Sequence, residues 1–321
     1  MISNGTIRKY VTERIKPFRL KVFGYAIVFG ILIGLITGTI GSVLGFAAGI
    51  IGSLITLPIT AILNLAESDA SSLNQLISQS LSSICSIVIS LFTSVFAIGY
   101  TKEMLMSVND NDDVSPVDFF KLGWSDWKRI VQTYLRLWLK YLPALIIIFV
   151  GAIITVVGGF ISGNEIISIV IALTGLAIIF AGWIYFLIVS LLYQTIPYEL
   201  IYDETSSAKD ILVKARETLR GHLWQWTRMN YFYMFIFFIV MFITIIGLAI
   251  LIGLFAYLIS TAGNGAAAIG MLLLFVGVFA FALICIAASF LLQYFTAKNI
   301  YNLDELYKVI QKEKSGEVSP I

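Results

Sequence analysis

The residues best suited to chemistry lie in one short basic and aromatic stretch, RETLRGHLWQWTR, which covers residues 216 to 228. Basic residues near an anionic membrane surface attract it with about 1 kcal/mol each, so this stretch could contact a lipid headgroup or a membrane partner. Enzymatic chemistry on the headgroup is a further hypothesis. The interpretation we prefer is that tryptophan anchors the chain at the interface and the cations mark the cytoplasmic side. The candidate contact residues are Arg216, Arg220, Gly221, His222 and Trp224.

The residue types and motifs in the sequence give little support for a zinc site, a nucleotide-binding loop or a serine nucleophile. The single histidine and the two cysteines, Cys85 and Cys285, are too far apart in the sequence for a usual zinc site. The sequence has no GxxxxGKS or GxxxxGKT phosphate-binding motif. The serine-rich segment Ser71 to Ser90 has no base at membrane depth that could activate a nucleophile. We therefore expect no enzymatic activity, no catalytic residue, no metal and no cofactor.

The composition is that of a polytopic membrane protein. Hydrophobic residues make up 59% of the 321 residues and charged residues only 12%, which lies outside the usage of soluble globular proteins. The longest run without Asp, Glu, Lys or Arg, Asn230 to Ala297, could hold two membrane spans. The net charge of +2 gives no reason to expect nucleic acid as a partner. The expected partners are membrane lipids, with a membrane protein or a second copy of the chain as alternatives.

The cations divide the chain into inner and outer segments. All 21 Lys and Arg residues lie in four blocks, at residues 1–21, 102–140, 209–228 and 298–314. Because basic loops stay in the cytoplasm, an even number of crossings must separate each block from the next. This predicts a multi-pass protein with both termini in the cytoplasm.

The region between the first two basic blocks raises a question of parity. From Val22 to Thr101 there is apolar length for three segments, but three crossings would carry the second basic block to the outside. We therefore expect that residues 44–65 do not span. They could continue the first helix outward, re-enter and leave on the same face, or lie along the outer interface. Pro58 favours a bend, which suits the second and third options. Six spans remain, arranged as an all-α bundle of three hairpins.

The chain is predicted to form a single integral membrane domain, residues 1–321. It consists of an interfacial N-terminal helix at residues 1–21, six spans within residues 22–297 and a cytoplasmic tail at residues 298–321. Amphipathic helices are expected in the cytoplasmic segments, and one of them starts at a capping box formed by Ser207 and Asp210. A basic and aromatic junction followed by a hairpin recurs three times, which suggests a pseudo-threefold arrangement.

Two series of glycines in the first apolar run predict close helix packing. A spacing of four residues puts each series on one face of a helix, where missing side chains let another backbone approach. We prefer packing against a neighbouring helix of the same chain, with a homodimer face or a lipid-accessible groove as alternatives. The first series is Gly30, Gly34 and Gly38, and the second is Gly41, Gly45 and Gly49.

The stretch from Pro197 to Tyr233, PYELIYDETSSAKDILVKARETLRGHLWQWTRMNYFY, resembles the signature of a bacterial membrane family called domain of unknown function 975. In that family a span ends near an aromatic and acidic loop. A short helix with Arg, a hydrophobic residue, a basic residue, Gly and an aromatic residue then precedes the next span. SPVDFFKLGW, residues 115 to 124, is similar to an earlier segment of the family, whereas Ala215 stands where members often have serine. The short-helix positions correspond to Arg216, Leu219, Arg220, Gly221 and Trp224.

The resemblance implies a six-span protein of a bacterial plasma or inner membrane and no established activity. It also implies a distant likeness to the membrane domains of glycerophosphodiester phosphodiesterases, whose catalytic domain this sequence lacks. Our leading expectation is a non-enzymatic integral membrane protein that engages lipids, amphipathic molecules or peptides, or a membrane partner. The alternative is a transporter or permease for an uncharged or amphipathic substrate. A continuous cavity bounded by the glycine series and by Ser71 to Ser90 would favour that alternative.

Overall fold

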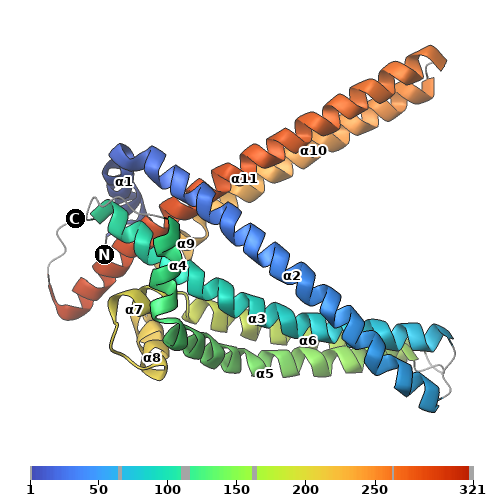
Figure 1. Ribbon diagram of the computed structural model, residues 1–321, viewed down its shortest axis with the longest axis horizontal. Coiled ribbons are helices and arrows are strands. Elements are labelled where there is room, and N and C mark those ends of the chain that lie inside the picture. The colour runs from blue at the N-terminus through green and yellow to red at the C-terminus, as the bar shows by residue number, and fades with distance from the viewer. Residues whose placement is uncertain (1, 64–66, 110–115, 161–164, 262–263, 318–321) are drawn as a thin grey trace. The chain divides into compact units, whose positions relative to one another are not determined.

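The computed structural model describes residues 2–63, 67–109, 116–160, 165–261 and 264–317, and every regular element within them is a helix (Figure 1). The expectation of an all-α fold is confirmed. The elements in chain order are α1 (Asn4–Ile15), η1 (Lys16–Phe18), α2 (Arg19–Leu63), α3 (Glu67–Asn109), α4 (Pro116–Ser125), α5 (Trp127–Phe160), α6 (Glu165–Leu192), α7 (Ile196–Tyr202), α8 (Ala208–Leu219), α9 (Leu223–Asn230), α10 (Phe232–Thr261) and α11 (Asn264–Ser315).

Five helical segments among the described residues are long and apolar enough to cross a membrane. α10, a helix of 30 residues, covers the first part of the run Asn230 to Ala297, for which two spans are predicted. Long helices therefore occur throughout residues 22–297, where six spans are expected. The five segments are Asn4–Ala61, Cys85–Val108, Trp127–Thr155, Ile166–Tyr202 and Phe275–Ser315.

The helices group into two compact units. One unit consists of Met1–Gly30 and Trp224–Ile321, and the other consists of Ile31–Leu223. We call them the terminal unit and the central unit. The terminal unit contains α1, η1, α9, α10 and α11, the central unit contains α3 to α8, and α2 begins in the former and ends in the latter.

α2 shows which of the three options residues 44–63 follow, because it runs as one helix from Arg19 to Leu63. At about 1.5 Å per residue its 45 residues extend over roughly 67 Å, about twice the thickness of a hydrocarbon core. Residues 44–63 thus continue the first helix, whereas residues 64 and 65 lie outside the described residues. The helix does not end at Pro58 but continues through it to Leu63. Proline removes only one backbone donor, and it does so here close to the helix end.

The central unit is built on the antiparallel helices α5 and α6, which lie side by side (Figure 1). Glycines make this close approach possible: a Cβ atom built on Gly151 would lie 2.8 Å from the carbonyl oxygen of Gly175. At one end of the pair, α3, α7 and α8 pack around a buried hydrophobic cluster. Its residues are Val95, Ile98, Ile130, Leu137, Val189, Ile196, Leu200, Ile211, Leu212 and Ala215.

The terminal unit uses the predicted N-terminal amphipathic helix as a packing element. The hydroxyl of Ser3 accepts a hydrogen bond from the Thr6 backbone N–H at 3.1 Å and caps α1. α1 packs against α11, and an ion pair of 2.5 Å joins Arg14 of α1 to Glu305 of α11. The apolar face of α1 is therefore covered by protein. The buried residues on that face are Ile7, Val11 and Ile15.

Candidate functional site

α8 is the amphipathic helix that begins at the predicted capping box. Ser207 has the extended backbone of an N-cap, and its hydroxyl accepts a hydrogen bond from the Asp210 backbone N–H at 3.3 Å. The same hydroxyl donates to the Asp210 carboxylate at 2.6 Å. The apolar residues, spaced three and four apart, form one buried face, so the charged residues must lie on the other. The buried residues are Ala208, Ile211, Leu212, Ala215, Thr218 and Leu219.

Gly221 ends this helix in a conformation that suits glycine. Its φ angle is +87°, in the left-handed region that side chains with a Cβ rarely adopt. The backbone N–H of His222 donates to the carbonyl oxygen of Leu219 at 3.0 Å across the turn. Gly221 therefore determines where α8 stops and where the chain leaves toward α9.

A basic groove lies between the exposed face of α8 and the polar ends of α5 and α6, with a volume of about 890 Å³. α5 contributes Arg136, Leu139 and Lys140, and the end of α6 contributes Leu192. Tyr193 follows α6 and also lines the groove. α8 contributes Lys209, Leu212, Val213, Arg216, Glu217 and Arg220. The lining thus combines cations with apolar side chains drawn from three helices.

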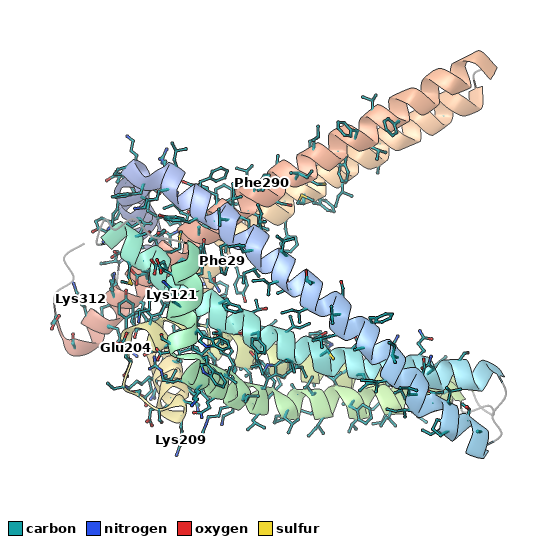
Figure 2. The ribbon with its side chains drawn as sticks, in the orientation of Figure 1. Phe29, Lys121, Glu204, Lys209, Phe290 and Lys312 are labelled. Carbon is teal, nitrogen blue, oxygen red and sulfur yellow. The ribbon has the colours of Figure 1, made fainter. Side chains whose placement is uncertain are left out.

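The charges of the basic groove are strongly unbalanced. Its five cations face one carboxylate, Glu217, so the lining has a formal net charge of +4. All five cations are exposed, and within the described part of the chain none of them belongs to an ion pair. Figure 2 shows Lys209 pointing away from the helix bundle at the start of α8. Uncompensated cations around a hollow attract anions.

Arg129 holds α7, and with it the start of α8, against α5. Its guanidinium donates hydrogen bonds to the carbonyl oxygens of Leu200, at 2.9 Å, and of Asp203. It also makes an ion pair of 3.0 Å with Asp126, which leaves its side chain 15% exposed. These bonds satisfy carbonyl groups at the end of α7 that have no partner within the helix. From the sequence alone Arg129 is only one of the cations of residues 102–140, because the carbonyls that it binds are about 70 residues away.

Two buried hydrogen bonds connect α8 to the segment before it. The Thr195 hydroxyl donates to the carbonyl oxygen of Ala215 at 3.1 Å. The Thr218 hydroxyl donates to the Glu199 carboxylate at 2.6 Å, and both residues are buried. Such bonds are costly to break in a buried setting because each leaves a polar group unsatisfied. These bonds therefore hold the buried side of α8, the helix that carries three of the groove cations.

Asp203 organises the loop between α7 and α8. Its carboxylate accepts hydrogen bonds from the backbone N–H of Thr205, at 3.3 Å, and of Ser206, at 3.0 Å. It also accepts from the Lys214 ammonium and from the Ser206 hydroxyl. The Lys214 hydrogen bond, followed by that of Ser206, lowers the pKa of Asp203 well below its ordinary value of 3.8. The carboxylate is therefore most stable when it is ionised and the loop is folded.

Asp203→Asn is expected to lower stability at neutral pH by about 1 kcal/mol, through loss of charged hydrogen bonds. The folded pKa of Asp203 is depressed, so its contribution is complete above the unfolded pKa of about 4 and is lost as the pH falls below it. The natural chain should therefore lose this part of its stability in acid, and the variant should not. Thermal unfolding in detergent at a series of pH values measures the effect. Equal pH profiles for the two proteins would contradict the assignment.

The candidate contact residues of the sequence analysis divide between two places. Arg216 and Arg220 line the basic groove, Gly221 forms the turn after α8, and His222 is half-buried beyond it. Trp224 belongs to the terminal unit and is 71% exposed. The structure adds cations of α5 to the two arginines. In the sequence those cations indicate only sidedness, since it is the packing of α5 on α8 that brings them to the same groove.

Trp224 lines a second, smaller groove within the terminal unit, of about 520 Å³. Arg8 and Arg228 contribute its cations. The Arg8 guanidinium lies 3.5 Å from the centroid of the Phe232 ring, and it donates a hydrogen bond to the carbonyl oxygen of Arg228 at 3.3 Å. A cation stacked on a ring in this way is partly neutralised by the aromatic face. This groove is consequently less suited to an anion than the basic groove.

The two glycine series of α2 lie mostly beside open space. A Cβ on Gly30 would lie 2.8 Å from the Gln293 side chain, and one on Gly41 would lie 3.8 Å from Ile89. Nothing lies within 4 Å of a Cβ placed on the other four, which are Gly34, Gly38, Gly45 and Gly49. An apolar groove of about 190 Å³ lies between α2 and α3, and its lining is aliphatic and aromatic apart from Thr37 and Thr93. It suits a hydrocarbon chain better than a polar solute.

Comparison with models of known protein families, with curated proteins and with solved structures finds no match. The resemblance to the domain of unknown function 975 family therefore stays a prediction. The described residues contain no group of three or more His, Cys, Asp or Glu side chains placed to hold a metal ion. Cys85 and Cys285 are both free thiols.

Proposed function

We propose that this chain is a multi-pass integral membrane protein that binds lipids or other amphipathic molecules at the basic groove and does not transform them chemically. We place both termini in the cytoplasm, as the four basic blocks predict. We place the protein in a bacterial cell membrane, as the resemblance to the domain of unknown function 975 family implies. Among the expected partners it favours amphipathic small molecules over peptides and partner proteins. The proposal rests on the lining of the basic groove, which combines cations with apolar side chains.

The position of the basic groove along α5 supports an amphipathic ligand. The last cation of this helix is Lys140, and the residues from Tyr141 to Phe160 carry no charge. Twenty helical residues extend over about 30 Å, the thickness of a hydrocarbon core. The groove would then lie at the depth of the headgroups, where an amphipathic molecule changes from polar to apolar. Leu139 and Val213, which are 66% and 49% exposed, provide apolar surface beside the cations.

Native mass spectrometry of the full chain, purified in mild detergent, tests this proposal. The natural chain is expected to retain a lipid or another amphipathic molecule after detergent exchange. Replacing both Leu139 and Val213 by Gln should reduce the retained fraction about tenfold, because the ligand loses roughly 1 to 2 kcal/mol of apolar contact. Leu135→Gln is the control, since Leu135 is exposed on the same helix outside the groove. A natural chain that retains no such molecule would contradict the proposal.

A further inference from the structure

The cations of the basic groove come from two helices packed against each other. Arg136 and Lys140 are four residues apart on α5, and Arg216 and Arg220 are four residues apart on α8. This spacing puts each pair on one helix face, with about 6 Å of helix rise between its members. Lys209 extends the α8 set by two further turns. Cations of α5 therefore line one side of the groove, and cations of α8 line the other.

The number of these cations indicates the charge of the occupant. Like charges close together repel one another, so a lining with a net charge of +4 is unfavourable until an anion enters it. A ligand with one negative charge would leave most of this repulsion in place. A headgroup with two or more negative charges could pair with α5 and α8 at once. Arginine favours phosphate for this purpose, because its planar guanidinium binds two oxygens together.

Apolar surface continuous with the groove indicates that the anion belongs to a lipid. Leu139 in the lining is followed along the same face of α5 by Leu142, Ile146 and Phe149, at spacings of three and four residues. These three side chains are 48%, 54% and 66% exposed. Acyl chains leaving the groove could therefore lie along α5 toward the centre of the bilayer. A soluble phosphate compound would make no use of this surface.

We infer that the basic groove binds a lipid whose headgroup carries at least two negative charges on phosphate, with the headgroup between α5 and α8 and the acyl chains along α5. This inference rests on the proposed function and gives it a ligand class. Basic pockets at the cytoplasmic ends of membrane helices bind such headgroups in general. The four-residue spacing on both helices supplies the selectivity, because only a multiply charged headgroup spans both pairs.

The test compares three lipids on the full chain in detergent, by titration followed with native mass spectrometry. Cardiolipin carries two phosphate charges, phosphatidylglycerol carries one, and phosphatidylcholine has no net charge. Cardiolipin is expected to bind at least tenfold more tightly than phosphatidylglycerol, with phosphatidylcholine weaker still. Equal affinity for the three lipids would overturn the inference and leave the proposed function standing. Binding of none of them would overturn both.

A pair of variants assigns the binding to the groove. Lys140→Gln with Arg216→Gln removes one cation from each helix, and the affinity for cardiolipin should fall about 30-fold, since each cation near a lipid surface contributes about fivefold. The matched control, Arg19→Gln with Lys128→Gln, also removes one arginine and one lysine, both exposed and outside the groove, and should change the affinity less than threefold. Equal losses in the two double variants would overturn the inference.

Two further measurements separate the inference from its competitors. Lys140→Arg with Arg216→Lys keeps both charges and should keep cardiolipin selectivity, which distinguishes loss of charge from loss of folding. Inorganic pyrophosphate should displace cardiolipin only at concentrations at least a hundredfold higher. Displacement at equal concentrations would show a site for soluble phosphates and overturn the inference.

Discussion

A Gly175→Ala variant is expected to be less stable than the natural chain by about 2 to 3 kcal/mol, because it overpacks a tight helix contact. A Cβ atom on Gly175 would lie 2.5 Å from the backbone nitrogen of Thr155 and 2.7 Å from the carbonyl oxygen of Gly151. Both are backbone atoms, so α5 as a whole must move away from α6. Alanine improves helix propensity by about 1 kcal/mol, which offsets only part of this cost.

Thermal unfolding in detergent, followed by tryptophan fluorescence, measures the effect of Gly175→Ala. Trp138 contacts Tyr141 within α5, and Trp183 contacts Phe186 within α6. The Tyr141 and Phe186 rings contact each other between the two helices, with 4.6 Å between centroids, so both tryptophans lie next to the contact that is lost when the helices separate. Gly38→Ala is the matched control, since a Cβ there meets nothing within 4 Å. It should leave stability unchanged or raise it by up to about 1 kcal/mol. Similar midpoints for Gly175→Ala and Gly38→Ala would show that α5 and α6 do not pack at these glycines.

The contrast between these glycines shows what sequence spacing can predict about packing. A spacing of four residues correctly places Gly34 and Gly38 on one face of α2, but it does not say whether another helix lies against that face. The tight contact between α5 and α6 uses Gly151, Gly175 and Gly182 instead. Gly175 and Gly182 are seven residues apart, which also puts them on one helix face. The seven-residue spacing can be seen in the sequence, but the sequence does not show which helix packs against these glycines.

Features decided by neighbouring residues were predicted from the sequence more fully than contacts between distant parts of the chain. The start of α8 follows from Ser207 and Asp210, because a cap is decided within four residues. The end of α2 could not be decided in this way, since the effect of Pro58 depends on its distance from a helix end that sequence does not define. In the candidate site, Arg216 and Arg220 were singled out from their own surroundings. Arg136 and Lys140 were not, because they reach the groove only through the packing of α5 on α8.

Arg129→Ala is expected to free the segment from α7 to α8, with a local loss of about 3 kcal/mol. The change removes the hydrogen bonds from the guanidinium to the carbonyl oxygens of Leu200 and Asp203 and leaves Asp126 without its ion pair. Arg129→Lys should be intermediate, because one ammonium cannot replace a planar group that reaches several acceptors. Hydrogen exchange measured by mass spectrometry should show faster exchange in residues 195–222.

The location of the lost hydrogen-exchange protection distinguishes release of α7 and α8 from destabilisation of the whole unit. Peptides from the paired parts of α5 and α6 should keep their protection in Arg129→Ala, because their contact depends on glycines far from Arg129. Lys128→Ala, at the exposed neighbouring position, should change neither region. Equal loss of protection in α6 and in α8 would mean that Arg129 supports the whole unit.

The same variant links the support of α8 to ligand binding. Arg129 does not line the basic groove, so a direct contact with the ligand cannot explain any change in affinity. Release of α8 would displace Lys209, Arg216 and Arg220 while Arg136 and Lys140 stay on α5. Cardiolipin affinity should then fall at least tenfold, and selectivity over phosphatidylglycerol should disappear, because a headgroup held by α5 alone pairs with only two cations. Retained selectivity in a variant whose α8 exchanges freely would show that the α5 cations bind the lipid without α8.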